Sequence, residues 1–220
     1  MRAVEIVKAF CALLLAAALA WFAYSRFHPP ITYPPGVLVG AEPEQWEVPA
    51  GTGPVTHGAY RLKPLAQYWI EARILHRENY HFDRPAKLAP TDLAVGWGPM
   101  SDQAVLDRLE ISQSMRFYFY QYRNPPPIPQ EEIARHSANM HIIPADDQIA
   151  AACKSLRAGE LVRLEGQLVE ATGPQIGTWR SSLRRDDTGN GACELFLVAK
   201  ISRLEPDAVR ELHPSALVSR

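Results

Sequence analysis

The residues whose types could do chemistry gather in three short polar tracts that lie far apart in the sequence. In the first tract Trp97 lies between two glycines, which let a backbone or a ligand approach closely. In the second tract Asn139 and His141 share one face of a predicted strand. The third tract contains Arg184. We expect one pocket or face to be lined by Trp97, Asn139, His141 and Arg184. The candidate ligand-binding residues are Trp97, Ser101, Asp102, Asn139, His141, Trp179, Ser182, Arg184, Asp186 and Glu194.

Hydrolysis in the cell envelope, with a metal ion or a Cys/His pair, is the alternative chemistry for these residues. It would use His141 with Asp102, Asp186 or Glu194, and such side chains must converge within hydrogen-bond reach. The sequence contains no nucleophile elbow, no phosphate-binding glycine loop and no helical histidine pair at a spacing of four. We therefore predict no metal and no cofactor, and we favour a binding role.

Cys153 and Cys193 are the two cysteines that follow the N-terminal apolar segment. Cys153 lies on the apolar face of a predicted helix, and Cys193 lies on the apolar face of a predicted strand. Both patterns point into one core, and an oxidising compartment then favours a disulfide. Two reduced core thiols are the alternative. Cys193 beside His136 or His141 is the one nucleophilic pairing to consider, although an apolar strand does not activate a thiol.

Composition excludes several classes of protein. The 220 residues are 47% hydrophobic and 21% charged, which is ordinary for a globular chain and excludes a disordered or many-span protein. A formal net charge of -1 argues against a nucleic-acid binder, because binding to phosphates needs cations. Three cysteines are too few for a disulfide scaffold.

The N-terminal segment predicts a membrane anchor. The run from Ala9 to Tyr24 carries no charge and ends in aromatic residues, and Arg2 and Lys8 precede it. The positive-inside rule then places the N-terminus in the cytoplasm and the remaining chain in the periplasm or outside the cell. A cleaved signal peptide is the alternative, and both interpretations export the rest of the chain.

Four regions are expected along the chain. Residues 1–28 form the anchor, a proline-rich stalk covers 29–59, an extracytoplasmic α+β domain covers 60–205, and a tail covers 206–220. The pattern predicts strands at 68–76, 115–122, 139–143, 161–171 and 192–203, and helices at 101–109, at 130–136 and after Asp146. We expect a mostly antiparallel, twisted sheet, with a small OB-like barrel as the more specific alternative.

Three tracts resemble a set of uncharacterised, single-anchor bacterial membrane proteins. The tracts are 92–102 (DLAVGWGPMSD), 137–145 (SANMHIIPA) and 179–189 (WRSSLRRDDTG), and the likeness covers roughly residues 65–203. The resemblance implies a discrete module and brings no activity with it. The charge placement around residues 9–24 predicts a single pass through the inner membrane. We expect the domain to bind a protein or a small ligand in the bacterial cell envelope, and to bind no nucleic acid.

Overall fold

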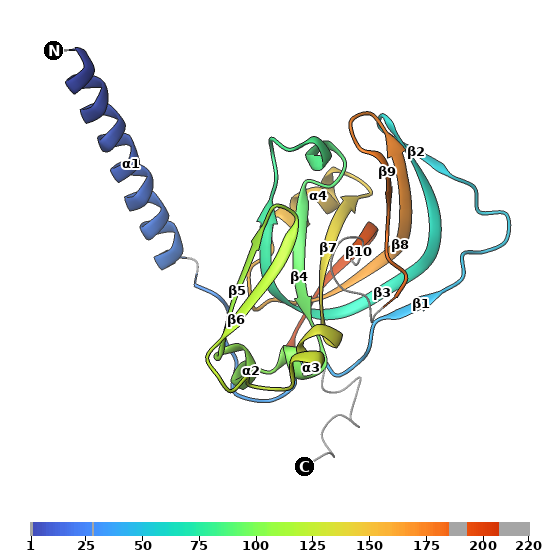
Figure 1. The fold of residues 1–220 in the computed structure, drawn as a ribbon. Helices are drawn as coiled ribbons and strands as arrows, with labels where there is room; N and C mark the ends of the chain where they lie inside the picture. Colours follow the sequence, from blue (N-terminus) through green and yellow to red (C-terminus); the bar gives the residue numbers. More distant parts are fainter. Residues whose placement is uncertain (1, 28, 185–192, 207–220) are drawn as a thin grey trace. The chain divides into compact units, whose positions relative to one another are not determined.

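The computed structural model describes residues 2–27, 29–184 and 193–206 (Figure 1). It divides into two units, Met1–Ile31 and Thr32–Arg220. The first unit contains the helix α1, Arg2–Phe27. Among the described residues there is no helix with the length and apolar character needed to cross a membrane. The predicted helix is thus confirmed, and the predicted transmembrane span has no support from the structure.

The second unit is built on a closed ring of strands. The pairing runs from β3 (Tyr60–Asn79) to β4 (Thr91–Gly96), β7 (Ser137–Pro144), β10 (Glu194–Leu204), β8 (Leu161–Gly173) and back to β3. Every neighbouring pair is antiparallel except β7 and β10, which are parallel. Figure 1 shows β3 and β8 curving together along most of their length. The α+β class with a mostly antiparallel sheet is therefore confirmed.

The length of β3 allows the ring to close. The strand has 20 residues, of which Arg61 to Arg73 pair with β8 along one edge, and the register shifts between Pro64 and Ala66. On the other edge β3 pairs with β4, with a second shift between Ile74 and His76. Such bulges bend a strand and increase its twist, so one strand can belong to both sides of the barrel.

A large apolar cluster fills the interior of the ring. It takes residues from every strand of the ring, and one end is covered by α4, Asp147–Ser155. The side chain of Asp146 caps α4 by accepting a hydrogen bond from the amide of Ile149, as the sequence predicts. The largest interior side chains include Tyr68, Ile70, Ile74, Leu93, Trp97, Met140, Ile142 and Phe196.

A two-stranded sheet covers part of the outer face of the ring. It consists of β5 (Leu109–Ser114) and β6 (Phe117–Tyr122), which form a hairpin. The tyrosines of β6 pack inward against Leu75, Ala94 and Ile133. The strand predicted at 115–122 is thereby confirmed from Phe117 onward, with the phenylalanines of β6 on its exposed side.

Short elements complete the unit. Strands β1 (Glu44–Trp46) and β2 (Val55–His57) pair with β3, and β9 (Gly177–Arg180) pairs with β8. The short helices are η1 (Arg84–Lys87), η2 (Gly98–Ser101), α2 (Gln103–Leu106) and α3 (Gln130–Arg135). The predicted helix at 101–109 is much shorter than expected, because β5 already begins at Leu109.

From Thr32 onward the proline-rich segment belongs to the second unit, and it is held there by side chains of the domain. The hydroxyl oxygen of Ser101 accepts hydrogen bonds from the amides of Leu38 and Val39, and both of these residues are buried. The carboxylate of Asp102 accepts another from the amide of Gly36 at 2.8 Å. Because an extended, proline-rich chain makes no hydrogen bonds within itself, these side chains supply the partners that it lacks.

Gly166 offers a test of ring closure, because it sits on β8 between β3 and β10. A Cβ at this position would lie 2.0 Å from the carbonyl oxygen of Leu197. We predict that Gly166→Ala lowers the free energy of unfolding by about 2 kcal/mol or more, because the backbones must separate. Gly53→Ala is the matched control, since no atom lies within 4 Å there. Urea titrations of both variants check this, and equal midpoints would contradict it.

Candidate functional site

The candidate site begins with a buried pair on the outer face of the ring. Asp92 on β4 lies directly opposite His141 on β7, and the Asp92 Oδ2 atom is 3.0 Å from the His141 Nδ1 atom. Their side chains are 0% and 5% exposed. Buried carboxylates require partners, because removing an unpaired charge from water costs several kcal/mol. Asp92 therefore marks the point around which other polar groups must gather.

Arg116 supplies the main counter-charge to Asp92. It lies in the turn between β5 and β6, where Met115 and Arg116 both have positive φ, at 51° and 70°. This is the backbone of a tight two-residue hairpin turn. The Arg116 guanidinium reaches the Asp92 carboxylate at 2.8 Å and contacts the two carboxylate oxygens of Asp83 at 2.6 and 3.0 Å. It also donates to the carbonyl oxygen of Ala89.

Tyr80 completes the surroundings of this arginine. The guanidinium carbon of Arg116 lies 3.8 Å from the centre of the Tyr80 ring, and the Arg116 amide donates to the Tyr80 hydroxyl. Burial alone would lower the pKa of Arg116, but its hydrogen bond to Asp83 and the charge of Asp92 outweigh that effect and raise it. Burial also raises the pKa of Tyr80. Arg116 is thus a permanent cation that holds the hairpin turn to the loop after β3.

A chain of amide groups extends the network along the hairpin. The His76 ring contacts Gln113, the Gln113 amide donates to Asn139, and the Asn139 amide donates to the Arg116 carbonyl oxygen. The Asn139 amide nitrogen also lies 3.9 Å from the Cys193 sulfur. Asn139, which the sequence selects as a ligand-binding residue, therefore joins the hairpin to the ring.

The third tract reaches this network through one residue. The Trp179 ring on β9 lies with its centre 4.8 Å from that of His141. The structure thereby brings together Asn139, His141 and Trp179 from the predicted set.

Sequence reasoning missed Asp92, Arg116 and Gln113. Asp92 sits in a strand buried on both faces, where no alternation draws attention to it, and the positive charge of Arg116 within an aromatic run is the one signal of its role.

Trp97, Ser101 and Asp102 lie elsewhere. Trp97 belongs to the interior cluster with Leu93 and Val95, on the opposite face of β4 from Asp92, and its indole nitrogen donates to Glu42. Ser101 and Asp102 hold the proline-rich segment, as described above. The structure thus gives this tract a local role in positioning the N-terminal part of the domain.

The remaining predicted residues lie around the start of β10. The Ser182 amide donates to the Cys193 carbonyl oxygen, and the Ser182 hydroxyl accepts from the amide of exposed Arg184. Glu194 is opposite Met140 in the register, so it lies on the interior face, opposite to that of His141. Asp186 lies outside the described residues.

The predicted disulfide between Cys153 and Cys193 is wrong. Neither residue belongs to a disulfide. Cys153 is buried in the interior cluster beneath α4, whereas Cys193 lies beside Asn139 on the outer side. The sequence places both on apolar faces, but the α4 residue Cys153 packs on the interior side of the sheet and Cys193 lies on its outer side.

The hydrolase arrangement expected from the sequence does not form in the described residues. The carboxylate beside His141 is Asp92, whereas Asp102 caps α2 at the other end of β4. The described part of the chain also contains no group of three or more His, Cys, Asp or Glu side chains placed to hold a metal ion.

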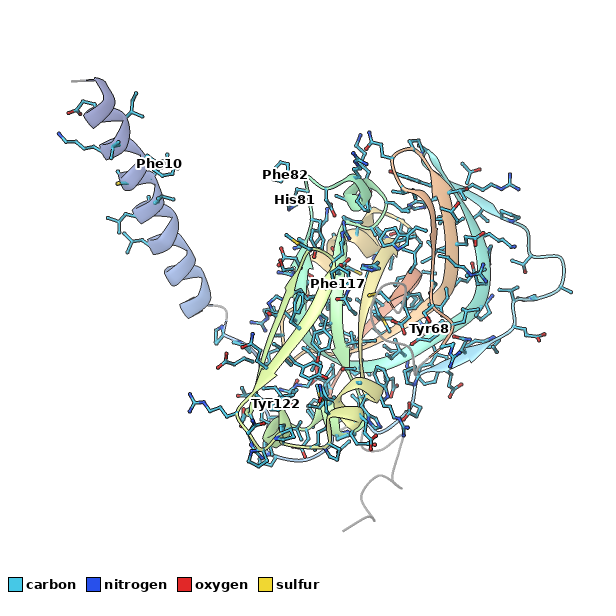
Figure 2. All side chains as sticks on the ribbon, in the orientation of Figure 1. Phe10, Tyr68, His81, Phe82, Phe117 and Tyr122 are labelled. Carbon is cyan, nitrogen blue, oxygen red and sulfur yellow. The ribbon has the colours of Figure 1, made fainter. Side chains whose placement is uncertain are left out.

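Exposed apolar side chains lie directly beside the Arg116 network. Phe82 is 101% exposed and Met115 is 83% exposed, and each is adjacent in sequence to a residue of the Arg116–Asp83 ion pair. Figure 2 shows His81 and Phe82 projecting from the loop after β3, near the end of the hairpin that carries Phe117. We call His81, Phe82 and Met115 the tip surface.

Comparison of the chain with family models, with curated proteins and with solved structures finds no match. The resemblance to single-anchor bacterial membrane proteins stays a prediction.

We predict that Arg116→Met lowers the free energy of unfolding by about 3 to 5 kcal/mol, because it leaves the Asp92 carboxylate buried without its cation. Asp83→Asn removes the partly exposed partner of the same arginine. It should cost about 1 kcal/mol, because water screens that charge. Guanidinium titrations followed by tryptophan fluorescence compare the two. Equal losses would contradict the central role of Asp92.

A second prediction concerns Cys153. Burial raises its pKa to about 12, so at pH 8 its thiol stays protonated. Iodoacetamide should modify Cys153 in the folded protein at least about a hundredfold more slowly than in the unfolded chain. Peptide mass spectrometry after timed quenching measures both rates. Equal rates would show that the helix does not protect this thiol.

Proposed function

We propose that this chain is a membrane-attached binding module of the bacterial cell envelope, and that it binds a partner protein through the tip surface. The observation that carries the proposal is the pairing of exposed apolar side chains with a buried, charged support. Phe82 and Met115 are exposed to water, yet the residues beside them are fixed by the Arg116–Asp83 ion pair. A rigid apolar projection loses little conformational entropy on binding, which favours its use as an interface anchor.

The topology supports an OB-like barrel as the more specific fold. The ring order β3–β4–β7–β10–β8, the parallel pair β7–β10 and the helix α4 between β7 and β8 all agree with that architecture. OB-folds bind ligands on the outer face of their second and third strands and in the adjoining loops. In this chain those strands are β4 and β7, and the β5–β6 hairpin and Trp179 cover the polar residues there. The loop of Phe82 remains exposed beside that covered face.

The character of the tip surface favours a protein over other ligands. Its apolar members, Phe82 and Met115, are exposed on a projection, and such side chains fit an apolar pocket on a partner. A nucleic acid would need a basic surface, and the formal net charge is -1. Asn139 and His141 then act as positioning residues beneath the hairpin.

The location is inferred from the N-terminal sequence. The uncharged run from Ala9 to Tyr24, preceded by Arg2 and Lys8, favours attachment to the inner membrane with the domain on the periplasmic side. The α1 side chains of Phe10, Leu13 and Leu15 are exposed, which suits an apolar surrounding. The enzymatic alternative gains no support from a site in which His141 is buried under Trp179 and the hairpin.

Site-specific photo-crosslinking in living cells tests the binding surface. A photoreactive phenylalanine analogue at Phe82 should give a discrete crosslinked band of higher mass. The same analogue at Val55, also exposed, is the matched control, because β2 pairs with the Tyr60 end of β3, whereas the loop of Phe82 follows its Asn79 end. Adding Arg116→Met should reduce the band from position 82 severalfold, because the support is lost. Identical bands from both positions would contradict a specific surface.

The location has its own test. A reporter fused after Arg220 that is active only in the periplasm should be active, and a reporter active only in the cytoplasm should be inactive. The reverse result would overturn the inferred topology while leaving the binding surface to be judged separately.

A further inference from the structure

The β6 strand presents an exposed, uncharged edge. Its sequence from Phe117 to Tyr122 contains no charged residue and no proline, and among the described residues its one strand partner is β5. Phe117 and Phe119 are 39% and 47% exposed, with ring centres 6.4 Å apart. Proteins usually protect such an edge with charge, proline or a cover, because its unpaired backbone groups invite another strand.

We propose that two copies of this chain pair through their β6 strands, antiparallel and about a two-fold axis. The two β5–β6 sheets then form one four-stranded sheet. This inference goes beyond the proposed function and does not depend on it, because it is argued from the edge of β6. Met115, at the end of that edge, is the one residue that the pairing shares with the tip surface.

Self-complementarity argues for a second copy as the occupant. When a two-fold axis pairs a strand with its own copy, each residue faces the residue that lies equally far on the other side of the axis. The strand must therefore be compatible in charge and size with its own reversed sequence. With the axis at Phe119, this residue faces its own copy and Phe117 faces Gln121. No like charges meet, and aromatic cross-strand pairs stabilise a sheet. A strand with alternating charges would not permit this arrangement.

The charged residues at the ends of β6 are also compatible with the axis. Arg123 would come opposite Met115, which is uncharged and exposed. The guanidinium of Arg116 is already occupied by Asp83 and Asp92. The inward tyrosines, Tyr118, Tyr120 and Tyr122, pack against the ring and keep the edge extended.

The assembly would present two tip surfaces at once. If a partner protein also carries two binding sites, the second contact becomes intramolecular and the overall affinity rises without any new contact.

The test uses the full chain in a mild detergent, with sedimentation equilibrium as the measurement of mass. The wild type should contain two chains per particle. Phe119→Arg should contain one, because two arginines would face each other across the axis. Phe82→Arg, which changes a more exposed phenylalanine outside β6, should keep two chains. Thermal unfolding midpoints matched to wild type confirm that each variant is folded, and Phe119→Lys, which also places like charges across the axis, replaces Phe119→Arg if the latter does not fold.

A charge-pair experiment then identifies the interface directly. Phe119→Glu alone should also contain one chain, whereas an equal mixture of Phe119→Glu and Phe119→Arg should form particles with one copy of each. A single chain for the wild type at every concentration would overturn the proposal. So would a two-chain particle for Phe119→Arg alone, which would place the contact elsewhere, or failure of the mixture to associate. Loss of crosslinking at Phe82 with the dimer intact would count against the proposed function alone.

Discussion

The ion pair between Arg116 and Asp92 is the interaction on which the outer layer of this domain depends. Asp92 is fully buried on β4, and the cation that offsets its charge comes from the turn of a hairpin far along the chain. A buried ion pair contributes little net stability, but the loss of one partner is strongly destabilising. The pair therefore acts as a constraint on geometry: the hairpin must end at this point on the ring. Asp83, Tyr80 and Asn139 are then arranged by the same arginine.

The ring below this layer depends on a different constraint, the close approach of three backbones at Gly166. β8 runs between β3 and β10, and the glycine faces the carbonyl oxygen of Leu197 where the register of β10 is about to shift. Closure leaves no open edge between β3 and β8, which is how barrels avoid unwanted strand pairing. The hairpin outside the ring does not share that protection, which is why its edge, and not that of the ring, is open to a second chain.

The sequence predicted the elements that carry their own local signals. The capped helix after Asp146 and the alternating aromatic strand at Phe117 are of this kind, and both are confirmed. β4 was missed because it is buried on both faces, so its residues show no alternation of apolar and polar side chains. β5 was missed because LEISQS is mostly polar, and the apolar partner that defines it comes from β6. The predicted site failed in part for a related reason. A strand pattern shows which residues of one strand share a face. Whether Trp97 shares a face with His141 depends on the register between two strands, which the pattern of either strand does not show.

The binding of the proline-rich segment has a mechanical consequence. That segment is held by Ser101 and Asp102, just beyond the Gly96 end of β4, while the loop that carries Phe82 meets the sheet at the Thr91 end, where Tyr80 bonds to Pro90. A pulling force between these two points runs along β4, and the hydrogen bonds to β3 and β7 lie across that direction. They are therefore loaded together in shear and not opened one after another. A domain connected in this way transmits tension from one end to the other as a stiff link.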